Sequence, residues 1–216
     1  EGVVVHSTAE PVGEFSCSNE LLNRIRTLVR WAQRSNMVSV LTDCPHREKL
    51  GWLEQYHLNG PAIRYEFDVN RILAKGMRDM ADSQTDEGLI PNIAPEYTVF
   101  PGTFRAAAEW GCAFIVVPWQ QYLFTGDTAL LREYYPSMQK YMDYLASKAK
   151  DHIIDEGLGD WYDLDGKDRP GHAKLTPPAI TATAFYYYDA KLLSQIAELL
   201  GKDEDVEKYA VLATDI

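Results

Sequence analysis

The stretch "EWGCAFIVVPWQQYLF", residues 109–124, is apolar almost all the way round when its residues are placed at helical spacing. A surface helix carries a single apolar stripe, whereas a helix that is apolar on every side is covered by its neighbours. We therefore expect a helix over residues 108–124 that is buried on most sides, kinked at Pro118 and closed by Gly126.

Apolar residues recur at helical spacing in five further segments, which predicts a domain built from helices. These helices are expected from Leu21, from Pro61, after Asp127, after "TPP" at 176–178, and from near Asp203. We expect Ser18 to cap the first of them and Pro136 to divide the fourth into two pieces.

Three long segments separate these helices, at 36–55, 83–107 and 150–177. Loops of this length in a domain are usually functional. Successive connections between antiparallel helices alternate between the two ends of the domain, so the first loop should begin at the end opposite the other two. To bring the first loop to the same end as the others, we expect residues 36–42 to run back along a helix in an extended conformation.

The composition excludes several classes of protein. With 216 residues, 46% hydrophobic and 25% charged, the chain is that of an ordinary globular domain. A net charge of −11 and the absence of basic runs argue against a nucleic-acid partner. The longest apolar run, 113–119, is too short for a membrane span, and no signal peptide is recognisable. We expect a soluble protein, and the composition leaves open whether it is cytoplasmic or exported.

The chain divides at about residue 15. Residues 1–15 begin with β-branched residues and break at Pro11 and Gly13, which is typical of the tail of a preceding β-rich domain and a linker. Residues 16–216 form the helical domain, and their helical register continues to Ile216 without a stop signal. We expect the domain to be truncated at this end.

Chemistry-bearing residues are densest in "TDCPHREKLGW", residues 42–52. A metal site from Asp43, Cys44, His46 and Glu48 lacks any recurring ligand spacing, so no metal and no cofactor is predicted. A thiol nucleophile at Cys44 would need a base, but side chains two residues apart usually diverge. The cysteines at 17, 44 and 112 are far apart and indicate no disulfide framework.

Two interpretations of the same stretch remain. Arg47, Glu48 and Lys49 are compatible with a solvated turn. Alternatively, the acids Asp43, Glu48 and Glu54 flank Trp52, and sugar-cleaving sites combine acids with aromatic platforms. A glycosidase needs one protonated carboxylic acid and a second carboxylate, and the residues favour this interpretation.

The segment "TDCPHREKLGWLEQ" resembles the signature of bacterial α-L-rhamnosidases of glycoside hydrolase family 78. The resemblance continues through "EGLIPNIAPEY", "EWGCAFIVVPWQQYLFTGD", "GLGDWYDLDG" and "LTPPAITATAFYYYDAKLLSQIAELLGK". It implies an all-α fold, an (α/α)6 toroid of helical hairpins of which about the first half is present. Loops at one end would form a pocket for a terminal rhamnose, which is hydrolysed with inversion.

The resemblance also implies roles for individual residues. Glu48, four residues before the motif tryptophan, corresponds to the proton donor. The residues implied to bind substrate are Asp43, Arg47, Trp52, Glu54, Trp110 and Trp161. The general base would lie beyond Ile216, so the chain alone should be inactive. The implied partners are a rhamnose-containing glycoside, the remaining half of the barrel and flanking β-sandwich domains.

Two positions depart from the pattern of many family members. Gln55 stands where an acid is common, with Glu54 one residue earlier, and Cys112 stands where an aspartate is common. Both bear on sugar specificity. The alternatives are another (α/α)6 glycosidase or lyase, and a non-catalytic carbohydrate-binding module.

Some polar residues have no assigned role. Glu109 either contacts substrate or braces a loop. The same two roles are open for Glu96 and Asp160, which are acids in the long loops. His57, His152 and His172 are expected in loops or at the surface.

Overall fold

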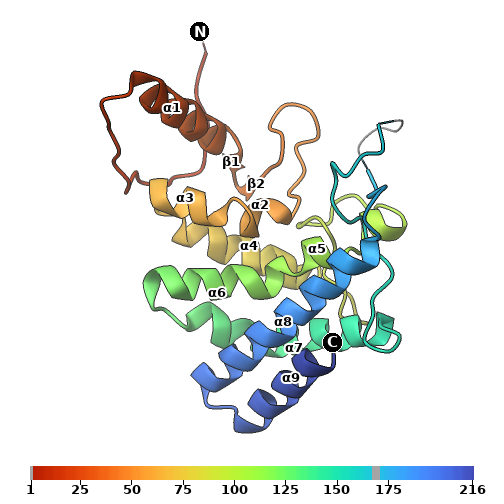
Figure 1. The fold of residues 1–216 in the computed structure, drawn as a ribbon. Helices are drawn as coiled ribbons and strands as arrows, with labels where there is room; N and C mark the ends of the chain where they lie inside the picture. The colour runs from red at the N-terminus through yellow and green to blue at the C-terminus, as the bar shows by residue number, and fades with distance from the viewer. Residues whose placement is uncertain (1, 167–170) are drawn as a thin grey trace.

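Helix α6, Ala113–Thr125, is the helix around which most of the others pack, as the apolar stretch predicts. The computed structural model describes residues 2–166 and 171–216 (Figure 1). All residues from Ala113 to Pro118 are buried, and the helix ends at Gly126, whose φ of 73° is left-handed. Its neighbours are α2 (Glu54–His57), α3 (Gly60–Glu66), α4 (Asn70–Asp82), α5 (Ala108–Gly111), α7 (Ala129–Lys148) and α8 (Pro178–Leu200). Residues 108–111, expected within this helix, form the separate turn α5.

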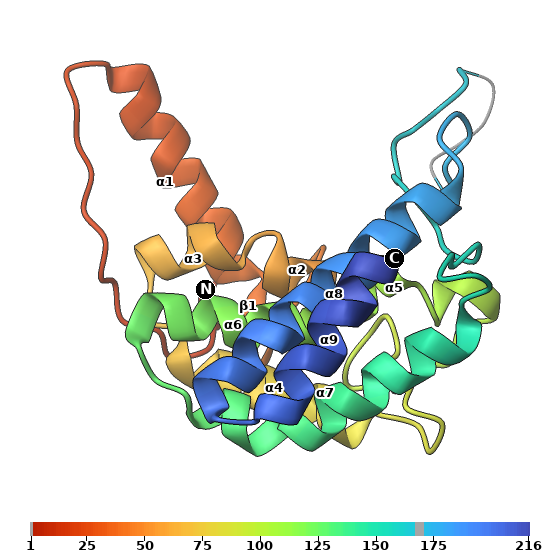
Figure 2. The same ribbon diagram turned by 60° about the horizontal axis from the view of Figure 1, so that its bottom comes forward.

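Helices α8 and α9 (Asp203–Asp215) form a hairpin that lies beside α7 (Figure 2). Gly201, with φ 69°, ends α8 as predicted. The Tyr135 hydroxyl donates to Asp205 Oδ2 at 2.9 Å, which fixes the start of α9 against α7. No described helix has both the length and the hydrophobicity that a membrane span requires.

Helix α1, Glu20–Ser35, stands apart from the other helices and buries none of its residues (Figures 1 and 2). Its cap is Asn19, whose side chain accepts from the Leu21 N–H at 3.0 Å, so the prediction of Ser18 is wrong by one residue. One contact of α1 with the rest of the domain is the ion pair of Arg26 with Glu66, in which Nε and Oε1 lie 2.8 Å apart.

The single helix expected from Pro61 is divided into α3 and α4. Phe67 is extended, because residues 10–12 pair with residues 66–68 across an antiparallel bridge between Pro11 and Phe67. The Val12 N–H donates to the Glu66 carbonyl, and the Asp68 N–H donates to the Glu10 carbonyl. These long-range hydrogen bonds replace those of a continuous helix.

Pro136 does not divide the fourth helix, contrary to the prediction, because α7 runs without a break from Ala129 to Lys148. A proline inside a helix costs about 3 kcal/mol. On both sides of it, Tyr135 and Met138 are fully buried in the core. Their burial favours a continuous helix and offsets the lost hydrogen bond.

The expected extended return at 36–42 is also wrong. Strands β1 (Met37–Val38) and β2 (Val40–Leu41) form a tight hairpin around Ser39, whose φ is 68°. The Ser7 N–H and hydroxyl bond to this hairpin, but residues 2–15 contain no strand of their own. A short 3-10 helix, Gly102–Phe104, lies in the second long loop. The domain boundary near residue 15 stays a prediction.

Candidate active site

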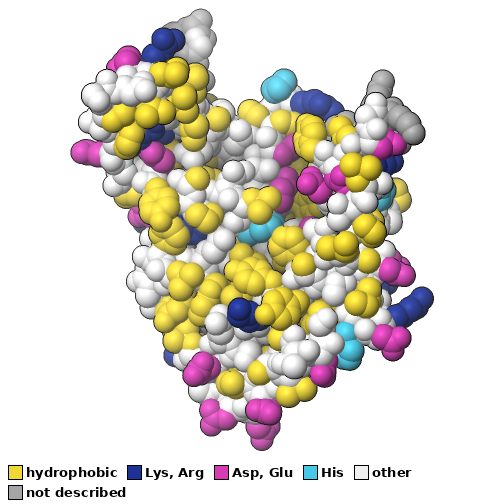
Figure 3. Space-filling view, in the orientation of Figure 1, with side chains coloured by type: hydrophobic (Ala, Val, Ile, Leu, Met, Phe, Trp, Pro, Cys, Tyr) yellow, Lys and Arg dark blue, Asp and Glu magenta, His cyan; other side chains and the backbone are white. Residues whose placement is uncertain are grey.

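A cavity of about 740 Å³ opens where the three long loops meet. This volume lies in the range of about 300–1,000 Å³ that is usual for small-molecule sites. Figure 3 shows a hollow in this face with acidic and apolar side chains at its rim. The lining residues come from the first loop and α2 (Asp43, Glu48, Leu50, Trp52, Glu54, His57, Leu58), from the second loop and α5 (Phe100, Phe104, Glu109, Trp110), and from the third loop and α8 (Leu158, Gly159, Asp160, Trp161, Tyr162, Thr181, Phe185).

The first loop reaches the cavity because it pairs with the second loop. A bridge joins Trp52 to Ile93, with the Leu53 N–H donating to the Asn92 carbonyl and the Ala94 N–H donating to the Gly51 carbonyl. A Cβ atom on residue 51 would lie 2.6 Å from the Ala94 carbonyl oxygen. The backbone approach therefore requires the glycine of the Gly-Trp motif.

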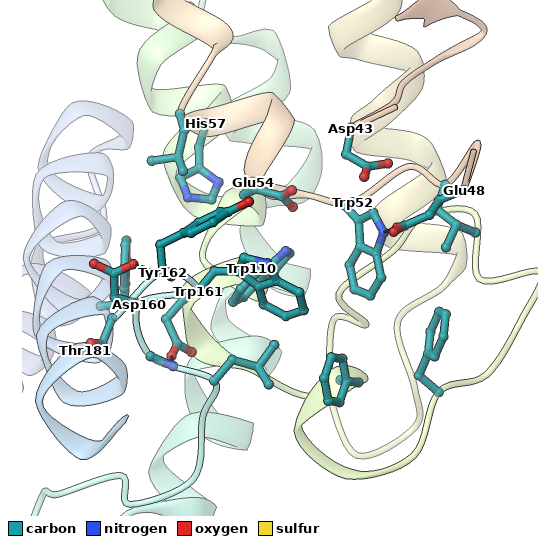
Figure 4. Close-up of a pocket in the computed structure, with 18 residues that line it drawn as sticks. Asp43, Glu48, Trp52, Glu54, His57, Trp110, Asp160, Trp161, Tyr162 and Thr181 are labelled. Carbon is teal, nitrogen blue, oxygen red and sulfur yellow. Dashed lines mark hydrogen bonds between the residues drawn. The ribbon is translucent and has the colours of Figure 1, made fainter. Parts of the chain in front are cut away.

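Glu48 is held by the motif tryptophan. The Trp52 indole N–H donates to Glu48 Oε2 at 2.9 Å. The Trp52 ring stacks on Phe100 with centroids 5.3 Å apart and meets Trp110 edge-on at 6.5 Å. In Figure 4, Glu48 and Trp52 lie on one side of the cavity and Asp160 and Thr181 on the other, with Trp110 between them. The Glu48 side chain, 36% exposed, thus lies beside an aromatic wall.

Glu54, the first residue of α2, is a carboxyl group that tends to hold its proton. Burial raises its pKa from 4.5 to about 7, and the hydrogen bond from the Gln55 side chain offsets this only in part. Gln55 donates to Glu54 Oε1 at 2.9 Å, and Asn59 donates to Gln55 at 2.6 Å. Gln55 therefore orients Glu54, and near neutral pH both forms of this acid are populated.

Unpartnered buried polar atoms gather around this cavity. Asp43 Oδ1, Glu54 Oε2, Glu109 Oε2 and Trp110 Nε1 are buried without a hydrogen-bond partner among the described residues. All four belong to residues that line the cavity. Each such atom costs about 1–3 kcal/mol, and unpaired groups are otherwise rare in native proteins. Their concentration here is typical of a site that binds a polar ligand.

The structure brings six of the seven predicted site residues together. Asp43, Glu48, Trp52, Glu54, Trp110 and Trp161 all line the cavity. Arg47 does not, because its side chain is 78% exposed and lies 3.9 Å from Glu48 on the solvent side. Its role in binding substrate stays a prediction.

Other lining residues were missed by the sequence reasoning. Phe100 and Phe104 complete the aromatic walls, and Phe104 meets Trp161 edge-on at 5.9 Å. Two aromatic residues four apart in a long loop were a usable signal. The surface position expected for His57 is wrong: it is buried on α2, its Nε2 lies 3.7 Å from Cys112 Sγ, and burial lowers its pKa to about 4.

Cys112 does not line the cavity. Its thiol is fully buried behind His57. One ligand atom each of Asp43, Cys44 and Glu48 lies within 4.8 Å of the others, although exposed acidic groups are often this close without an ion. The prediction of no metal is unchanged.

Residues 10–216 match the model of the bacterial alpha-L-rhamnosidase 6 hairpin glycosidase domain. The chain belongs to this family. An α-L-rhamnosidase of Formosa agariphila is 32% identical over 98% of the chain. Solved α-L-rhamnosidase structures from Dictyoglumus thermophilum and, in complex with L-rhamnose, from Streptomyces avermitilis superpose with TM-scores of 0.88 and 0.84 at 35% and 32% identity, over 99% and 97% of the chain.

The six-hairpin glycosidase family explains the helical architecture, and the predicted fold class is confirmed. The chain spans only 23% of the Formosa relative and 24% and 19% of the two solved chains. This coverage is consistent with the prediction that the chain contains only a part of the (α/α)6 barrel.

Proposed function

We propose that the intact protein hydrolyses terminal α-L-rhamnosides by inversion, and that this chain contributes the proton donor. Glu48 is the donor, and Asp43, Arg47, Trp52, Glu54, Trp110 and Trp161 bind the sugar. The general base lies outside these residues, across the ring, with the two carboxyl groups about 6.5–9.5 Å apart to hold a water molecule.

One observation carries this proposal: Glu48 is fixed by the indole N–H of Trp52 at the rim of a cavity whose walls hold four more carboxyl groups and further aromatic rings. Aromatic faces suit the apolar edge and methyl group of a deoxy sugar. The unpartnered polar atoms suit its hydroxyl groups, which both donate and accept.

Glu48 is partly exposed in this chain, whereas a general acid must be protonated when it acts. In the proposed enzyme, bound sugar and the remaining barrel would cover the Glu48 side chain.

Two apolar faces support the proposal that further helices complete the barrel. Along α1, large side chains are exposed (Figure 3), namely Leu21, Leu22, Ile25, Leu28, Val29 and Trp31. A second apolar groove runs along α8 and α9, lined by Ile153, Ala179, Ile180, Thr183, Ala184, Tyr187, Ala213 and Ile216. Exposed patches of this kind mark interaction surfaces.

A panel of aryl glycosides tests the function. The intact protein is expected to cleave the α-L-rhamnoside, and Glu48→Gln is expected to lower the rate strongly, whereas Glu207→Gln, an exposed control on α9, leaves it unchanged. The 216-residue chain alone is expected to be inactive. Cleavage of a different sugar would favour another glycosidase or lyase, and rhamnose binding without cleavage would favour a binding module.

A further inference from the structure

Glu109 is a buried acid between two walls of the cavity. It lies on α5 directly before Trp110, is 6% exposed, and is not among the residues assigned to sugar binding or proton transfer above. Its Oε1 accepts a hydrogen bond from the Gly159 N–H at 2.7 Å, 50 residues away along the chain. The carboxyl group thus joins α5 to the third long loop.

The third loop is shaped to receive this carboxyl group. A Cβ atom on residue 157 would lie 2.8 Å from Glu109 Oε1 and 3.2 Å from Oε2, so the carboxyl packs on bare backbone. Gly159 has a φ of 68°, which favours glycine. Leu158 between them is fully buried. The two glycines therefore let the loop wrap the acid.

The residues that follow this turn, Asp160, Trp161 and Tyr162, form one wall of the cavity. The α5 end of the link is itself fixed: Ala107 N–H donates to Asn92 Oδ1 at 2.9 Å. A displacement of the turn would move Trp161 relative to Trp110, and such misplacement is costly for catalysis.

We infer that Glu109 is a positioning residue, which fixes the Gly157–Gly159 turn and thereby sets the distance between the aromatic walls Trp110 and Trp161 for a sugar ring. This inference rests on the proposed function for its sugar. Burial raises the pKa of Glu109 while the N–H of Gly159 opposes this, so the hydrogen bond to the loop favours the charged form.

The test compares Glu109→Gln with Glu109→Ala in the intact protein. Glutamine keeps an oxygen that accepts from Gly159, so we expect kcat and KM within about threefold of the wild type, whereas alanine raises KM for an aryl α-L-rhamnoside roughly 10- to 100-fold. Glu156→Ala, an exposed acid in the same loop, is the control. An equal loss in the glutamine and alanine variants would overturn the positioning role.

A double-mutant cycle adds a second readout. Gly157→Ala should reproduce the effect of Glu109→Ala, but should cost little when Glu109 is already alanine, because the clash is then absent. Gly171→Ala, with no atom within 4 Å of its Cβ position, is the matched control. Additive losses would contradict the inference.

Hydrogen exchange of the Gly159 amide separates this inference from the proposed function. Exchange should speed up in Glu109→Ala and stay slow in Glu109→Gln, even for a protein that cleaves no rhamnoside. Unchanged protection of this amide in Glu109→Ala would refute the link.

Discussion

Replacing Glu54 by glutamine should remove a pH dependence of stability. Burial raises the pKa of Glu54 in the folded chain from 4.5 to about 7. The folded state therefore binds more protons than the unfolded state between these pH values, so the free energy of unfolding falls as pH rises through this window. The full shift corresponds to about 3 kcal/mol, and solvent in the cavity reduces this to about 2–3 kcal/mol.

Urea unfolding at a series of pH values between 4.5 and 8.5, followed by far-UV circular dichroism, measures this effect. The free energy of unfolding of Glu54→Gln minus that of the wild type should grow by about 2–3 kcal/mol from pH 4.5 to pH 8. Taking the difference cancels other titrating groups, and Glu207→Gln serves as the exposed control. A difference that stays constant with pH would refute the buried environment of Glu54.

Two further substitutions test the parts of the fold that hold the site. Gly51→Ala would place a Cβ atom 2.6 Å from the Ala94 carbonyl oxygen, so we expect a loss of about 1–3 kcal/mol in thermal or urea unfolding; a loss no larger than that of Gly171→Ala would contradict the close pairing of the loops. Asp189 is fully buried without a partner among the described residues, and burial raises its pKa well above 3.8. Its ionisation destabilises the fold as pH rises, so Asp189→Asn should be more stable than the wild type at pH 8 by more than about 1 kcal/mol, but not at pH 4; equal gains at both pH values would refute this.

Local sequence signals predicted the helices well where packing agreed with them. The apolar sequence of α6 was sufficient to predict its burial. The glycines at 126 and 201 were sufficient to predict where α6 and α8 end. These signals failed where pairing with a distant segment sets the backbone conformation, as in the bridge between Pro11 and Phe67 that separates α3 from α4. Pro136 misled for a similar reason, since the burial of its neighbours is a tertiary effect.

In the candidate site too, features set by local sequence could be predicted and features set by distant contacts could not. The motif and its resemblance located most of the residues that line the cavity, and Gly51 and Trp52 within the motif hold this loop by backbone pairing and ring stacking. The solvent-facing position of Arg47, the burial of His57 and the link of Glu109 to Gly159 depend on how the three loops meet. Helical spacing in the sequence does not specify how these loops pack against one another.

The proton-donor role of Glu48 is the central claim, and the dependence of the rate on the leaving group tests it most directly. In the intact protein, Glu48→Gln should lose far more activity on a phenyl α-L-rhamnoside, whose leaving group needs a proton, than on the 2,4-dinitrophenyl rhamnoside, whose leaving group does not. The same measurement on Glu54→Gln should show similar losses on both substrates. Equal losses on both substrates for Glu48→Gln, or the selective loss appearing in Glu54→Gln instead, would contradict the assignment.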